Sequence, residues 1–295
     1  MKKPFQYGGQ AIIEGVMMRG PEDLAMAVRK PNNEILVEKK KITSLTKKFP
    51  WLKLPLLRGV VALVESLVLG IQALTFSANQ SLEEEEEQLS TKELALSIGL
   101  ALAFGVLLFV IVPTGLTRMV DHLVPNVFLQ NIVEGIIRIT IFLIYIVVIS
   151  RMKDIQRVFQ YHGAEHKVIH AYEAGEPLIP AQIQKYSTLH PRCGTSFLLF
   201  VMVVSIFLFA FLGKQVLWWR FLSRVILMPL VAGISYELIR LSGRNADHRL
   251  MKILIAPGLL LQKLTTREPD DSQVEVAVKA LEAVLPDSAV LPDSD

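Results

Sequence analysis

Long apolar blocks alternate with short polar segments through the middle of the chain. The four longest blocks cover residues 94–116, 132–149, 197–212 and 216–241. The first and third blocks carry no charged side chain, and the second has only Glu134 and Arg138, both near its start. An apolar helix of about 20 residues is long enough to cross the hydrocarbon core of a bilayer. The pattern therefore predicts an α-helical multi-pass membrane protein with four spans.

Two further apolar stretches do not fit a simple span. Residues 56–76 contain Arg58 and Glu65, and residues 253–264 are too short to span and contain Pro257 followed by glycine. We expect both stretches to form helices or hairpins that lie at the membrane interface or re-enter it. A fifth span over residues 56–76 is the alternative, because its hydropathy alone permits one.

Basic residues give the expected orientation. They are concentrated before the first span, between the second and third spans, and after the fourth, whereas the loops at 117–130 and 213–215 have one each. The positive-inside rule then places both termini and the segment 151–195 in the cytoplasm, with the spans in the cytoplasmic membrane. A single cysteine, Cys193, excludes an intramolecular disulfide and fits a reducing compartment.

Composition supports this class of protein: 52% of the residues are hydrophobic, and the mean hydropathy is +0.42. The net charge of +3 is too small to indicate nucleic acid binding. The chain divides into a cytoplasmic β-rich unit (1–55), an interfacial helix with an acidic linker (56–93), the first two spans (94–150), a motif loop (151–195), the last two spans (196–241) and a cytoplasmic C-terminal segment (242–295).

The N-terminal unit shows turn and strand signals. Residues 25–29 and 34–38 flank Pro31-Asn32-Asn33, which is typical of a hairpin. Glycines within residues 8–20 indicate turns or close backbone approach. Together with the apolar blocks, these signals predict a helical membrane protein with a small cytoplasmic β-containing N-terminal unit. The glutamate run 83–87 is expected to be a solvated linker, and Asp271 to cap a short amphipathic helix.

Three of the six histidines occur at intervals of four in the segment His162-Gly-Ala-Glu165-His166-Lys-Val-Ile-His170. Residues four apart project from one face of a helix, so two of these imidazoles could bind one metal ion. His162 and His170 are about 12 Å apart along a helix, which leaves His162 with His166, or His166 with His170, as the pair. Glu165 completes the pattern of the inverted zincins, whose glutamate is a general base. The alternative is a polar face on a membrane-adjacent helix.

A second polar motif, residues 190–196, directly precedes the third span. Pro191 favours an extended backbone at His190, which we expect to point out of a loop. Cys193 lies beside a helix start for which Thr195 or Ser196 is a natural N-cap, a place that stabilises thiolate. Cys193 is therefore a candidate ligand or nucleophile, the alternative being a small buried thiol. Nitrogen and sulfur ligands favour zinc over magnesium or calcium.

Glu237 is a carboxylate inside the fourth apolar block, where ionisable groups are costly and often functional. Its distance downstream of His166 resembles that of the third ligand of an inverted zincin. An ion pair with Arg240 or Arg224 is the alternative.

Several motifs in order resemble one family. Residues 8–20, 161–167, 190–195 and 265–269 are similar to the YqhQ-like bacterial membrane proteins. The resemblance covers nearly the whole chain. It implies a metal-dependent enzyme, since the family is described as predicted metal-dependent enzymes of unknown function.

The leading hypothesis is a divalent, zinc-type metal site on the cytoplasmic face, with hydrolytic activity and Glu165 as the base. The metal-ligand candidates are His162, His166, His170, His190, Cys193 and Glu237. The rival hypothesis is a non-catalytic partner or regulator of another membrane protein, in which a metal or polar cluster only holds the loops together. A transporter is the third hypothesis, although four spans are few. The lipid bilayer is the expected partner in every case.

Overall fold

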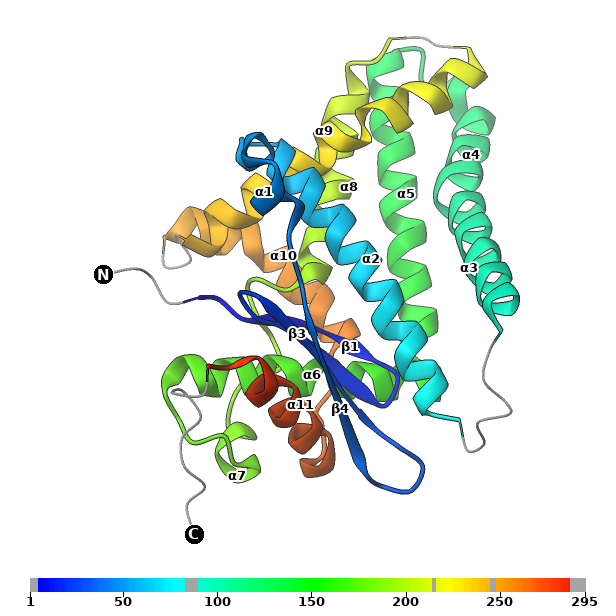
Figure 1. Ribbon diagram of the computed structural model, residues 1–295. Helices are drawn as coiled ribbons and strands as arrows, with labels where there is room; N and C mark the ends of the chain where they lie inside the picture. The colour runs from blue at the N-terminus through cyan, green and yellow to red at the C-terminus, as the bar shows by residue number, and fades with distance from the viewer. Residues whose placement is uncertain (1–4, 83–89, 214–215, 245–247, 287–295) are drawn as a thin grey trace.

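The computed structural model describes residues 5–82, 90–213, 216–244 and 248–286. Within these residues, an antiparallel sheet lies at one end of a group of long helices (Figure 1). The glutamate run 83–87 lies outside the described residues.

The sheet has four strands in the described part of the chain, paired in the order β1-β2-β3-β4. Their bounds are β1 (Gly8–Ile12), β2 (Gly15–Arg19), β3 (Asp23–Arg29) and β4 (Ile35–Lys41). The predicted hairpin is confirmed as β3–β4: the Lys30 amide donates to the Glu34 carbonyl, and Asn33 has a left-handed φ of 67°. A Cβ atom on Gly9 would lie 2.3 Å from the Met17 carbonyl oxygen, which confirms a close backbone approach.

Two helices distant in sequence cover the sheet. They are α6 (Lys153–Ala174) and α11 (Asp271–Val284), which share one apolar core with β2 and β3. Asp270, one residue before the predicted cap, is the N-cap of α11, and its side chain accepts a hydrogen bond from the Gln273 amide. The N-terminal sheet therefore depends on later parts of the chain for its core.

The remaining long helices form a bundle. The first is α3 (Thr91–Val106), which continues through the π-helical turn η3 (Leu107–Ile111) into α4 (Val112–Val120) and ends in the 3-10 turn η4 (Asp121–Leu123). The others are α5 (Val127–Ile149), α8 (Gly194–Ala210) and α9 (Leu217–Arg244). These helices cover the four predicted apolar blocks.

Among the described residues, four helices are long and apolar enough to cross a membrane. Three of them fall in the bundle, at Ala95–Met119, Val127–Ile149 and Trp218–Ser242, and the fourth is α2 (Leu57–Gln80). The bundle helix α8 is equally apolar but only 17 residues long. It nevertheless runs along α5 from end to end, because Asn131 donates to the Leu212 carbonyl at one end and Phe142 packs near Leu199 at the other.

A cluster of charged side chains lies inside the bundle. Glu134 is 1% exposed and accepts hydrogen bonds from Arg138, Arg220 and Arg224. Arg138 also donates its Nε–H to the Phe109 carbonyl at 3.0 Å, within the π-helical turn. The cluster thereby joins α3–α4, α5 and α9 around one carboxylate.

One face of helix α2 packs along the sheet. Arg19 is paired with Glu65 at 3.0 Å, Ala73 belongs to the apolar core under β2 and β3, and Ser77 Oγ accepts from the Ile13 amide at 3.1 Å. Elsewhere on its surface α2 leaves large apolar side chains exposed, namely Leu63, Val64, Leu67, Val68 and Leu74.

Three short elements, α1 (Leu45–Lys48), the 3-10 turn η1 (Pro50–Lys53) and α7 (Pro180–Ile183), and the longer helix α10 (Arg249–Thr265) complete the description. The stretch 253–264, expected as a helix or a hairpin, is part of the single helix α10 despite Pro257.

Candidate functional site

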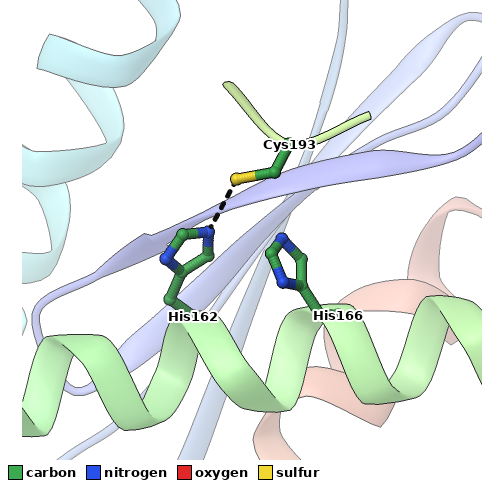
Figure 2. Close-up of side chains that lie close together, drawn as sticks. All are labelled: His162, His166 and Cys193. Carbon is green, nitrogen blue, oxygen red and sulfur yellow. Dashed lines mark hydrogen bonds between the residues drawn. The ribbon is translucent and has the colours of Figure 1, made fainter. Parts of the chain in front are cut away.

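Helix α6 positions four of the predicted site residues. His162, Glu165, His166 and His170 lie within about two turns of one unbroken helix, which ends at Gly175 in the left-handed conformation with a φ of 75°. Figure 2 shows the imidazoles of His162 and His166 projecting from α6 toward Cys193, which comes from the loop before α8. The structure therefore brings together the pair His162–His166 rather than His166–His170.

The cluster of His162, His166 and Cys193 has the dimensions of a metal site. One ligand atom from each residue lies within 4.8 Å of the other two, and His162 Nε2 is 3.2 Å from Cys193 Sγ. Zinc binds nitrogen and sulfur at about 2.0–2.3 Å, so ligand atoms a few ångströms apart can share one ion. The donor set of two imidazoles and one thiol fits zinc by its chemistry as well.

Backbone carbonyls fix the orientation of both imidazoles. His162 Nδ1 is 2.8 Å from the Thr265 carbonyl oxygen, and His166 Nδ1 is 2.5 Å from that of Thr188. A carbonyl oxygen can only accept, so each Nδ1 carries a proton, and in the neutral imidazole Nε2 then keeps its lone pair. Metal-binding histidines commonly have this arrangement, because a carbonyl partner on one nitrogen directs the other nitrogen at the ion.

Cys193 is itself the N-cap of α8, and its Sγ lies 3.4 Å from the Thr195 amide. The expected cap, Thr195 or Ser196, is therefore wrong by two or three residues. The Cys193 side chain is 7% exposed. The sulfur is thereby held at the start of α8, beside the two imidazoles.

Glu165 lies on the sheet side of the cluster and is 4% exposed. Its Oε1 accepts a hydrogen bond of 2.9 Å from the Gly9 amide of β1, and its Oε2 is 3.4 Å from His166 Nε2. Burial raises the pKa of Glu165, while His162 and the Gly9 amide act in the opposite direction. The carboxylate is thus held beside the candidate metal position by one oxygen, with the other oxygen directed toward it.

His190 and His170 form a second row of imidazoles beside the cluster. The ring centroids of His166 and His190 are 5.5 Å apart, and those of His190 and His170 are 4.6 Å apart. His170 Nε2 lies 3.0 Å from the Leu189 carbonyl oxygen. Among the described residues, neither imidazole belongs to the three-residue cluster.

The expectation that His190 points out of a loop is wrong. The side chain is buried, and burial lowers its pKa to about 2. The physical reason is Gln262 of α10, which accepts from the His190 amide at 2.8 Å and donates to the His190 carbonyl at 2.9 Å. This paired contact holds the loop against α10, so Pro191 determines the backbone of His190 but not its exposure.

Glu237 lies away from the histidines. Its carboxylate forms a bidentate ion pair with Arg58 at the start of α2. The alternative prediction, an ion pair, is therefore correct in kind but not in partner, which is Arg58 instead of Arg240 or Arg224. Arg224 is paired with Glu134. The structure does not bring Glu237 into the three-residue cluster.

Sequence reasoning missed the groups that orient the site. Thr188, Thr265 and Gly9 act through backbone atoms, for which side-chain patterns give no signal. Gln262 lies in an apolar helix, and only its polarity among apolar neighbours could have marked it.

Comparison with known proteins identifies the family. A family described as "Protein of unknown function (DUF1385)" matches residues 54–287, which include all the ligand candidates. The chain belongs to this family. It is similar to the "Uncharacterized protein YqhQ" of Bacillus subtilis (strain 168), with 37% identity over 297 residues, covering 96% of this chain and 93% of the relative. No solved structure matches the chain. The YqhQ-like resemblance is confirmed, and the family description names no reaction.

Proposed function

We propose that this protein is a membrane-bound, metal-dependent hydrolase whose zinc-type ion is held by His162, His166 and Cys193. The observation that carries the proposal is the orientation of both imidazoles by backbone carbonyls through Nδ1. With those hydrogen bonds in place, both Nε2 atoms and the Cys193 sulfur lie close enough together to share one ion.

The geometry also supports catalysis. Three protein ligands leave the fourth position of a tetrahedral ion for a water molecule or substrate. A zinc ion bound here supplies a Lewis acid that lowers the pKa of water. Glu165 is placed to accept a proton at Oε2, next to His166 Nε2, while the Gly9 amide keeps Oε1 in position. General-base function requires this kind of fixed carboxylate within reach of the reacting group.

The test of the catalytic proposal is Glu165→Gln, which keeps the size of the side chain and removes its basicity. We expect normal metal content but loss of activity. Because no substrate is specified, the readout is the set of membrane proteins and lipids that change in abundance when the gene is deleted in its own host. Glu165→Gln should reproduce the deletion, whereas wild type should reverse it.

Glu176→Gln is the matched control for this experiment, because Glu176 is an exposed carboxylate just beyond the end of α6. It should behave as wild type. Full complementation by Glu165→Gln, with the metal retained, would exclude the hydrolase.

Burial favours a second candidate, a structural metal. His166 is 2% exposed and Cys193 7%, and the cluster connects α6, the loop before α8 and α10. A closed site that only holds these segments together predicts that Glu165→Gln is harmless. It also predicts that metal removal by a chelator lowers the melting temperature of the protein.

We further propose that α3–α4, α5, α8 and α9 cross the membrane in succession and that α2 lies at its interface. Phe109 packs against Tyr145, while Thr114 contacts Glu134, so α3–α4 runs antiparallel to α5. The chain before α3 and after α5 is then on one side. A crossing by α2 would separate the sheet from α6, yet β1 contacts α6 directly through Gly9 and Glu165. Basic residues favour the cytoplasm for that side.

Thiol labelling in intact cells tests this topology. We expect a cysteine at the exposed position Ala181 to react with a membrane-impermeant reagent only after permeabilisation, because α7 lies on the cytoplasmic side. A cysteine at exposed His122 should react without permeabilisation. The wild-type protein, whose Cys193 is buried, gives the background level of labelling. Labelling of Ala181→Cys from outside would reverse the orientation.

A further inference from the structure

A cleft of about 790 Å³ lies between the start of β1, the first half of α2 and the last turns of α9. Gly8 and Gly9 form part of its wall on the sheet side, Val61 and Leu69 on the α2 side, and Tyr236 on the α9 side. The cleft thus opens where the sheet meets the helices proposed to contact the membrane.

Positive charge is in excess in this cleft. Arg19, Lys53, Arg58 and Arg240 line it among the described residues. Glu65 is paired with Arg19, and Glu237 with Arg58. Two carboxylates against four cations leave two positive charges, which Lys53 and Arg240 supply. A concave, cationic site of this kind favours an anionic ligand.

The rim of the cleft has the composition of a membrane-interface anchor. The segment 45–56, which contains α1 and η1, exposes Phe49, Trp51 and Leu54, with Trp51 59% exposed. The same segment carries Lys47, Lys48 and Lys53. Exposed aromatic side chains beside lysines are typical of the headgroup region of a bilayer. The exposed apolar face of α2 continues from this segment.

We propose that this cleft binds the phosphate group of an anionic phospholipid. Lys53 and Arg240 donate to the phosphate oxygens, and the exposed hydroxyl of Ser66 lies within the same cleft. The acyl chains extend along the side of α2 that adjoins the cleft, where Val64 and Val68 are exposed. A bound lipid of this class fixes the sheet against the membrane surface.

This site is distinct from the histidine cluster. Strand β1 separates the two, because Gly9 lines the cleft and donates its amide hydrogen to Glu165. None of the candidate metal ligands lines the cleft. Glu237 is connected to it only through its ion pair with Arg58. The inference therefore holds or fails independently of the proposed hydrolase.

The experiment uses the full chain in detergent and measures the binding of short-chain dihexanoyl phosphatidylglycerol by native mass spectrometry and by the shift in melting temperature. Dihexanoyl phosphatidylcholine, glycerol phosphate and inorganic phosphate are the comparison probes. We expect phosphatidylglycerol to bind more tightly than all three. Lys53→Gln combined with Arg240→Gln should weaken its binding by at least about tenfold, the effect of losing charge-assisted hydrogen bonds.

The matched control removes two charges outside both the cleft and its rim, Lys153→Gln with Arg151→Gln, both at exposed positions. It should bind phosphatidylglycerol as wild type does. The single variant Lys53→Gln, at an exposed position, gives a second measurement if the double variant folds poorly. Equal losses in cleft and control variants would overturn the site. Binding of glycerol phosphate or inorganic phosphate as tight as that of the lipid would overturn the lipid as its ligand.

Discussion

Replacing His166 with alanine is expected to reduce the zinc content of the purified protein from about one ion per chain to background. His166 belongs to the three-residue cluster, and its Nδ1 is held by the Thr188 carbonyl so that Nε2 is available to the ion. Loss of a direct ligand exceeds the about 10–100-fold effect of losing a supporting contact, so affinity should fall by well over tenfold. Elemental analysis of protein purified without chelators is the measurement.

His122→Ala is the control for His166→Ala, because His122 is exposed at the far end of the bundle. Its zinc content should equal that of wild type. His170→Ala adds a sharper comparison, since His170 lies on the same helix one turn beyond His166 but outside the cluster. Equal zinc content in the His166 and His122 variants would remove the metal hypothesis.

Glu134→Gln is expected to produce the largest loss of stability. The side chain of Glu134 is 1% exposed and is the carboxylate shared by Arg138, Arg220 and Arg224. Removing its charge leaves the guanidinium groups in a low-dielectric bundle without that counter-charge. Breaking a buried ion pair in this way costs about 3–5 kcal/mol. Thermal unfolding of the purified protein in detergent should show a clearly lower midpoint.

Glu237→Gln provides the comparison at a more exposed pair. Arg58 and Glu237 are each 27% exposed at the side chain, so solvent compensates much of the lost interaction. We expect a loss of about 1 kcal/mol or less. Similar midpoints for the Glu134 and Glu237 variants would show that the buried cluster contributes little to stability.

Much of the fold could be predicted from local signals. Long apolar blocks defined the bundle helices, and Pro31-Asn32-Asn33 defined the β3–β4 hairpin, because both depend on short stretches of sequence. The packing of α11 on the sheet could not be predicted, since it joins residues about 250 positions apart in the chain and depends on apolar faces that many helices possess. For the same reason, hydropathy alone did not decide between an interfacial and a spanning α2.

The candidate site was partly predictable. Helical spacing predicted that His166 pairs with a histidine one turn away and excluded one ion shared by all three, because an unbroken helix fixes those distances. It did not choose between His162 and His170 as the second ligand. Cys193 was predicted to join the histidines from another segment only because its thiol is a typical zinc ligand, and no spacing indicated the contact. The burial of His190 and the separation of Glu237 did not follow, because each depends on one tertiary partner, Gln262 or Arg58.

The contacts made by α10 impose an order on biosynthesis. His162 needs the Thr265 carbonyl for its orientation, and the His190 loop needs the Gln262 amide. A ribosome that has completed α6 and α8 has therefore made His162, His166 and Cys193. The nascent chain still lacks the α10 groups that orient His162 and the His190 loop. If the protein binds the proposed ion, we expect acquisition to follow synthesis of α10, late in translation. Prematurely terminated chains would consequently be metal-free, and their exposed ligands would distinguish them from finished molecules.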